Sequence, residues 1–178
     1  SVIFHDQART RGIKPILGCE VYVATGSRHA RSGTPGDTNN HLVLLAENLT
    51  GYHNLIKLVS AGYTEGFYYK PRIDKELLSQ HAEGLIGLSS CLKGEVATGL
   101  RTEQPRKATE AAASFRDILG PGNFFLEMQY QGIDIQRTVD AGLQPIARDL
   151  GLPVVCTNDV HYLKQDDYRP HDVLLCIG

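Results

Sequence analysis

Short, continuously apolar segments alternate along this chain with segments whose apolar residues recur at helical spacing. We predict strands at residues 16–24, 41–46, 84–89, 123–128 and 153–159. Helices are predicted at the start of the chain, after Thr50, around Leu77, up to Val96, and at 105–119 and 135–150. Strands that are apolar along their length are typical of a parallel sheet covered by helices. The pattern therefore predicts an α/β protein, either an open doubly wound sheet or part of a (β/α) barrel.

The composition excludes several classes of protein. A chain of 178 residues fits one domain, and its net charge of -2 gives no global basic field for nucleic acid. No apolar run is long enough to span a bilayer. The four cysteines are scattered, which indicates free thiols in a reducing compartment, and we expect a cytoplasmic protein. No glycine-rich phosphate-binding motif follows any predicted strand.

The two ends and one internal loop are unusual. The chain lacks an initiator Met, opens inside an apolar helical pattern and stops inside another at 174–178. Because natural domains usually begin and end in polar segments, we expect a piece of a longer protein. The polar stretch 25–40 is long for a loop in a compact domain, and such loops are generally functional or mobile.

The segment 153–162 turns from apolar to polar where its predicted strand ends. Side chains alternate faces in an extended chain, so Asp159 and His161 are predicted to point the same way. A carboxylate beside an imidazole at this end of a strand is typical of a metal or acid/base site in an α/β protein. The alternative is an Asp that only orients its neighbouring His through a hydrogen bond.

Further polar residues lie at other strand ends. Glu20 sits in an apolar run, where an unpaired carboxylate is costly, so it needs a partner or a cation. Cys91 and Glu127 follow or end strands, and His41 opens one. Each of these has a structural alternative: an apolar role for Cys91, a supporting hydrogen bond for Glu127, and a loop end for His41. Together, Cys, His and carboxylate ligands suit zinc or another late divalent metal.

Three cations, Lys70, Arg72 and Lys93, lie in predicted loops and could meet phosphates. A few loop cations are weak evidence of nucleic-acid binding, because most charges on a loop are simply solvated.

Six segments together resemble a known family, the PHP (polymerase and histidinol phosphatase) domain, and more narrowly the PHP domain at the amino end of bacterial replicative DNA polymerase III alpha subunits. The segments are 12–24, 41–48, 51–55, 66–72, 90–96 and 157–162. The likeness runs over nearly the whole chain, in matching order and spacing. It implies a distorted seven-stranded (β/α) barrel of parallel strands with outer helices.

The resemblance also implies metal ligands at the strands' carboxyl ends. Carried over by motif, the ligand positions are Glu20, His41, Cys91, Asp159 and His161, with Glu20, Asp159 and His161 also expected to be catalytic. The family's first two motifs, His-x-His and Asp-His, have no counterpart and would lie before Ser1. We therefore expect a single domain fragment, 1–178, with the last five β/α units. It should hold at most one well-formed site, at Glu20, His41 and Cys91, with zinc as the first choice and manganese as the second.

The function implied by the resemblance is metal-dependent 3′–5′ exonuclease or phosphoesterase activity within a DNA-directed DNA polymerase. Nucleotidyl transfer would reside in domains that this chain lacks, so we expect the fragment alone to be inactive. DNA and other replisome subunits are the expected partners through the parent protein. Two alternatives stay open: a free-standing PHP phosphoesterase acting on a small phosphate ester, and an inert stabilising module. Unpaired strand edges in an incomplete barrel also predict self-association. We expect no membrane contact, because no apolar run is long enough to span a bilayer.

Overall fold

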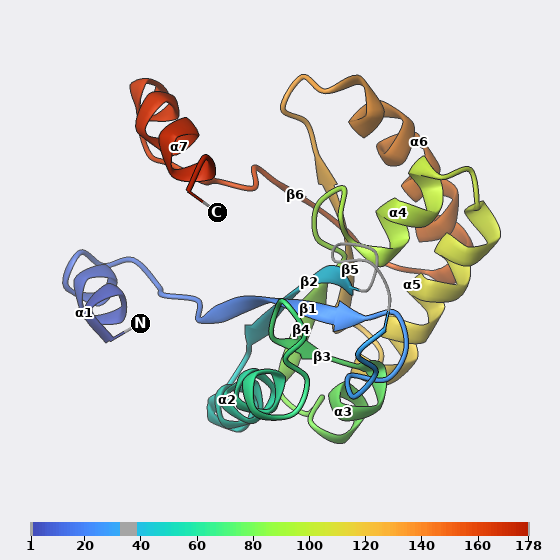
Figure 1. The fold of residues 1–178 in the computed structure, drawn as a ribbon, viewed down its shortest axis with the longest axis horizontal. Helices are drawn as coiled ribbons and strands as arrows, with labels where there is room; N and C mark the ends of the chain where they lie inside the picture. Colours follow the sequence, from blue (N-terminus) through green and yellow to red (C-terminus); the bar gives the residue numbers. More distant parts are fainter. Residues whose placement is uncertain (1, 33–38, 178) are drawn as a thin grey trace.

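A computed structural model describes residues 2–32 and 39–177 (Figure 1). One sheet of six strands forms the centre, and its strands are β1 (Gly18–Ala24), β2 (Asn39–Ala46), β3 (Arg72–Ile73), β4 (Leu85–Leu88), β5 (Phe124–Gln129) and β6 (Val154–Thr157). The helices are α1 (Val2–Thr10), α2 (Leu49–Thr64), α3 (Lys75–Gln80), α4 (Glu95–Arg101), α5 (Pro105–Leu119), α6 (Asp134–Leu150) and α7 (Tyr168–Leu175), with a short 3-10 turn, η1 (Gln165–Asp167). The predicted α/β class is confirmed. The sequence did not predict β3, which has only two residues, and part of the long loop, 33–38, lies outside the described residues.

The strand order is β3-β1-β2-β4-β5-β6. Neighbouring strands are parallel at β1–β3, β4–β5 and β5–β6, but β2 runs antiparallel to both β1 and β4. The prediction that all strands are parallel is therefore wrong at β2. The physical reason is the connection: a parallel neighbour needs a crossover, usually a helix, and the sequence between β1 and β2 has no helical pattern.

The reversed direction of β2 places its amino end at the rim formed by the carboxyl ends of its neighbours. Asn39 pairs with Ala24, the last residue of β1, and Ala46 pairs with Leu85, the first residue of β4. His41, near the start of β2, consequently lies at the same rim as the residues that follow β4.

The helices bury one core against this sheet. Helix α2 contacts β1, β2, β3 and β4, whereas α4, α5 and α6 pack on one another and reach β2, β4 and β5 (Figure 1). Leu44, Leu58, Leu85 and Leu126 are fully buried in this core. The apolar strands and the apolar helix stripes therefore meet as the sequence pattern predicts.

Local signals explain where several helices begin. Asp74 caps α3 by accepting a hydrogen bond of 2.9 Å from the Leu77 amide, and Pro105 opens α5 where the helix over 105–119 was predicted to begin. Thr50, after which the sequence predicted a helix, does not cap α2. Asn48 is the cap, because its side-chain oxygen accepts from the Gly51 amide at 3.0 Å and the helix begins at Leu49.

Helices α1 and α7 contribute no buried residue to the core, and both lie beside the main body in Figure 1. Their apolar side chains are largely exposed, for example Ile3 and Leu174. Self-association through such surfaces stays a prediction. In the part of the chain that the structure describes, no helix has the length and apolar character needed to cross a bilayer.

Arg72 is a structural residue and cannot meet phosphates as the sequence suggested. Its side chain is buried and donates hydrogen bonds to the carbonyl oxygens of Gly66 at 3.1 Å, Arg28 at 3.1 Å and Ala30 at 2.7 Å. Gly66 in turn has no room for a Cβ, which would lie 1.9 Å from the Arg72 oxygen. The loop from Gly66 to Arg72 is therefore closed at its base.

Replacing Arg72 with Ala should lower the free energy of unfolding by about 2–4 kcal/mol, because it leaves a cavity and three carbonyl groups without their donor. Urea denaturation measures the change. Lys70→Ala in the same loop is the control, since this exposed residue should change stability by less than about 0.5 kcal/mol. Equal losses in the two variants would contradict the structural role of Arg72.

Candidate metal centre at the strand rim

A cavity of about 660 Å³ opens at the rim described above. It is lined by all five residues that the sequence selected as metal ligands: Glu20, His41, Cys91, Asp159 and His161. These residues come from β1, the start of β2, the turn after β4 and the turn after β6. The fold thus brings together side chains that are separated by up to 141 positions, from 20 to 161, in the sequence.

The sheet register accounts for the pairing of Glu20 with His41. Tyr22 lies opposite His41 in the β1–β2 ladder, so Glu20 is the diagonal neighbour of His41 on the same face. The Nδ1 atom of His41 lies 2.7 Å from the Glu20 carboxylate. Glu20 has a partner, an imidazole, as expected, but its side chain is 41% exposed and is not buried as its apolar run suggested.

Cys91 approaches the same imidazole because the turn after β4 runs alongside the start of β2. The His41 amide donates to the Lys93 carbonyl at 3.0 Å, and His41 forms an isolated parallel bridge with Gly94. The Cys91 Sγ consequently lies 3.7 Å from the His41 Nδ1. Gly94 permits this course, since a Cβ there would lie 2.1 Å from the Ser89 oxygen.

Cys91 and Glu20 change the protonation of His41, and His41 in turn changes that of Glu20. Hydrogen bonding to Cys91 and then to Glu20, opposed by burial, raises the pKa of His41 to about 9. The hydrogen bond from His41 is the largest cause that lowers the pKa of Glu20, and the charge of His161 adds to the effect. At neutral pH the group is therefore an imidazolium held by a carboxylate and a sulfur atom.

The donor atoms of Glu20, His41 and Cys91 are of the kinds that bind zinc. The 2.7 Å between His41 and Glu20, however, is the length of a hydrogen bond and is too short for two ligands of one metal ion. Across residues 2–32 and 39–177, no set of three or more His, Cys, Asp or Glu side chains is arranged to hold a metal ion. Tetrahedral zinc would separate a nitrogen from an oxygen ligand by about 3.4 Å and from a sulfur ligand by about 3.6 Å. The 3.7 Å separation of His41 and Cys91 matches this spacing, whereas the 2.7 Å separation of His41 and Glu20 would have to open by about 0.7 Å.

Asp159 and His161 reach the cavity by a route that the sequence did not predict. Strand β6 ends at Thr157, and Asp159 has a left-handed φ of 49°, so the alternation of an extended strand does not apply. The His161 Nδ1 donates to the Asp159 carbonyl oxygen at 2.6 Å, since that oxygen can only accept. This bond leaves Nε2 of His161 as the free acceptor, the arrangement common in metal-bound histidines.

Glu127 does not line the cavity, but it accepts a hydrogen bond from Gln129, which does. It is buried, its Oε1 accepts from Gln129 Nε2 at 3.3 Å and from the Thr157 hydroxyl, and its amide donates to the Ser89 hydroxyl. Its other oxygen, Oε2, has no partner among the described residues. The supporting role that the sequence allowed for Glu127 is thus what the structure shows.

Sequence reasoning missed several residues of the cavity. His171 on α7 packs against the rings of His161 and Tyr162, at centroid distances of 5.7 and 5.3 Å. Gln129 and Gln136 also line the cavity, and both are buried polar residues. The position of Gln129 at a strand's carboxyl end was an available signal, but nothing in the sequence linked His171 to this rim.

Comparison with known proteins gives consistent matches. The sequence model of the PHP domain family matches residues 1–131. DNA polymerase III alpha subunits are similar over nearly the whole chain: that of Treponema pallidum is 50% identical over 98% of it, that of Thermus aquaticus 44% over 99%, and that of Aquifex aeolicus 39% over 98%. The chain spans only 15% of the length of each of these relatives.

The raised pKa of His41 predicts how the metal-free chain responds to pH. A histidine whose folded pKa is about 9 and whose unfolded pKa is near 6.5 stabilises the fold fully below pH 6.5 and loses that contribution as the pH rises through 9. We expect a loss on the order of 1–3 kcal/mol over this interval, measured by urea denaturation in EDTA. His41→Asn should flatten this part of the profile, and an unchanged slope in the variant would contradict the assignment.

Proposed function

Because the chain belongs to the PHP domain family, we propose that its rim cavity binds a divalent metal ion and hydrolyses phosphodiester bonds. The observation that carries the proposal is the convergence of Glu20, His41, Cys91, Asp159 and His161 on one cavity. The six-stranded sheet with its outer helices is consistent with a partial PHP-type barrel.

The proposal treats residues 1–178 as one PHP domain, although the family match ends at 131. Strand β6 pairs in parallel with β5 over four residues, from Val154 to Thr157, and so belongs to the same sheet. The turn after β6 then carries Asp159 and His161 into the cavity that Glu20 lines. The residues after 131, about a quarter of the chain, therefore supply part of the same site.

Each side chain has a role that follows from its chemistry. Glu20, His41 and Cys91 would hold a metal ion, which, when bound, lowers the pKa of a water molecule and neutralises charge on a phosphate. Deprotonation of His41 and separation of its ring from Glu20 would free their donor atoms. The free Nε2 of His161 can accept a proton or bind a metal ion. The carbonyl oxygen of Asp159 fixes the tautomer of His161.

Zinc is the metal that this donor set favours, because a thiolate and an imidazole are soft and borderline ligands, and manganese is the second choice. We propose one well-formed site. His41 already lies within hydrogen-bonding distance of both Glu20 and Cys91, whereas the described residues give Asp159 and His161 no further carboxylate, imidazole or thiol at such a distance.

The larger protein would be a DNA polymerase III alpha subunit of the cytoplasm, in which this domain acts as a 3′–5′ exonuclease on DNA and meets other replisome subunits. The high identity over nearly the whole chain supports this part of the proposal. Nucleotidyl transfer would belong to other parts of that protein, and the chain alone would hydrolyse DNA poorly or not at all.

A second candidate function, a stabilising module with an inert cavity, is favoured by one observation. The carboxylate of Glu20 and the ring of His41 form an ion pair, with 2.7 Å between the two groups. Such a pair can hold the rim together by itself.

Metal binding is tested with cysteine variants. Cys91→Ser should lower zinc affinity at least tenfold, since even the loss of outer-shell partners of metal ligands costs about 10–100-fold. Competition with a chelator and elemental analysis measure the affinity and the stoichiometry. Cys156→Ser is the matched control, because this exposed thiol does not line the cavity. Equal zinc affinity in the two variants would contradict a metal centre that includes Cys91.

A variant of the full-length protein distinguishes a hydrolytic role of the cavity from a stabilising role. Cys91→Ala should abolish most metal-dependent exonuclease activity if the cavity is catalytic, with the release of labelled 3′ nucleotides as the readout. A lowered melting temperature with unchanged exonuclease activity would instead support the stabilising module.

A further inference from the structure

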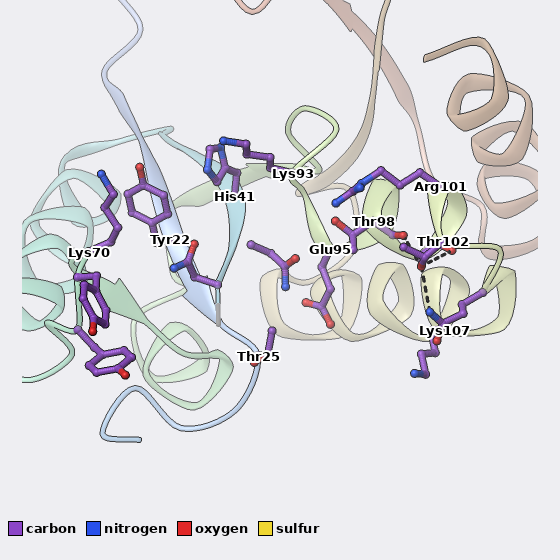
Figure 2. A pocket seen from close by; sticks show the side chains of 16 residues that line it. Tyr22, Thr25, His41, Lys70, Lys93, Glu95, Thr98, Arg101, Thr102 and Lys107 are labelled. Atoms are coloured by element: carbon purple, nitrogen blue, oxygen red, sulfur yellow. Dashed lines mark hydrogen bonds between the residues drawn. The ribbon is translucent and has the colours of Figure 1, made fainter. Parts of the chain in front are cut away.

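A second cavity, of about 740 Å³, lies directly beside the candidate metal centre. His41 and Lys93 line both cavities, so the two share a wall. Figure 2 shows Tyr22 and Lys70 on one side of this second cavity and Arg101 and Lys107 on the other. It therefore lies between the sheet and helices α4 and α5 and leads toward the rim. We call it the basic cavity.

Positive charge dominates the lining of the basic cavity. Four lysine and arginine side chains line it, namely Lys70, Lys93, Arg101 and Lys107, and none of them has a carboxylate partner among the described residues. Glu95 is the one carboxylate in the described lining, and Lys75 neutralises it at 2.9 Å. The cavity therefore presents a local positive field in a chain whose net charge is -2.

An aromatic pair stands beside these cations. Tyr68 and Tyr69 contact each other edge to face at a centroid distance of 4.6 Å, and both line the cavity. Tyr69 has a left-handed φ of 59° and is 61% exposed. A positive φ is costly for a bulky side chain, and it is retained here because Gly66 and Arg72 close the base of the loop. The loop thus holds an exposed aromatic ring beside Lys70.

From these observations we infer that the basic cavity binds single-stranded DNA and leads its end to the candidate metal centre. Cations that follow a phosphate backbone together with exposed rings on which bases stack are the two components of single-strand binding sites. Bases are available for stacking in a single strand and not in a duplex. The choice of DNA as the nucleic acid, and of the metal centre as its destination, rests on the proposed function.

The shared wall gives the DNA a direction. A phosphate near Lys93 would lie at the boundary between the two cavities, next to His41. Phosphates farther from the reacting bond would then contact Arg101 and Lys107, while a base stacks on Tyr69. An acidic peptide could neutralise the cations, but its carboxylates would not stack on the exposed ring of Tyr69.

Binding is tested by fluorescence anisotropy with a labelled oligothymidylate of roughly 12 nucleotides, in EDTA so that no hydrolysis occurs. Lys107→Glu should weaken binding about three- to tenfold and reduce the slope of log K against log salt by about 0.7 per lost phosphate contact. Arg106→Glu is the matched control. Arg106 is the preceding residue on α5, its side chain is 91% exposed, and it does not line the cavity.

Stacking is tested with a second pair of variants. Tyr69→Ala should weaken binding by about 5-fold or more, because one stacked base contributes strongly to single-strand affinity. Tyr63→Ala is the control, since Tyr63 is also 61% exposed but lies on α2 outside the cavity. Denaturation curves for all four variants show whether each remains folded.

The inference is overturned if Lys107→Glu and Arg106→Glu weaken binding equally, or if polyglutamate competes as well as unlabelled oligothymidylate does. Zinc affinity, measured on the same variants, keeps this result apart from the proposed function. Loss of DNA binding with zinc affinity unchanged supports the basic cavity. Intact zinc binding with no selective loss of DNA binding would refute the basic cavity alone.

Discussion

The antiparallel direction of β2 is the constraint on which the site depends. In a wholly parallel sheet, the amino end of this strand would lie at the opposite edge, about 25 Å away for a strand of eight residues. Because β2 is reversed, His41 meets Glu20 diagonally across the β1–β2 ladder, and the turn after β4 brings Cys91 to the same imidazole. Both cavities share His41, so the second site depends on the same reversal.

The sequence predicted the class of fold and the residues that line the rim cavity, but it did not predict how the chain brings each of them there. A carboxylate in an apolar run drew attention to Glu20, which does have a partner, although its side chain is exposed and not buried. Asp159 and His161 do line one cavity, yet a left-handed turn brings them there and not strand alternation. A short apolar strand has the same pattern whichever way it runs, so the only sequence signal for the direction of β2 was the lack of a helical pattern in the connection that precedes it. Arg72 shows the opposite failure, since a loop position gave no sign of its burial.

The group formed by Glu20, His41 and Cys91 explains how one rim can suit two functions. The Glu20 carboxylate, whose side chain is 41% exposed, is paired with the His41 imidazole at 2.7 Å, and a cation between the two side chains could take the place of that pairing. Either arrangement stabilises the same strand ends. The proposed stabilising role and the proposed metal-binding role would therefore be two states of one set of side chains, which differ by the occupant between them and by less than 1 Å of movement.

The basic cavity shows why net charge is a poor guide to the local charge of a surface. A total of -2 describes the field far from the molecule, whereas a bound phosphate responds to charges within about a Debye length, near 10 Å. Lys70 and Lys107 lie 37 positions apart in the sequence, from 70 to 107, and only the packing of α4 on β2 and of α5 on α4 and β4 places them around one space. The carboxylates that balance the total lie mostly elsewhere, and the one in the described lining is neutralised by Lys75. Partner class therefore follows from the local arrangement of charges and rings, which composition averages away.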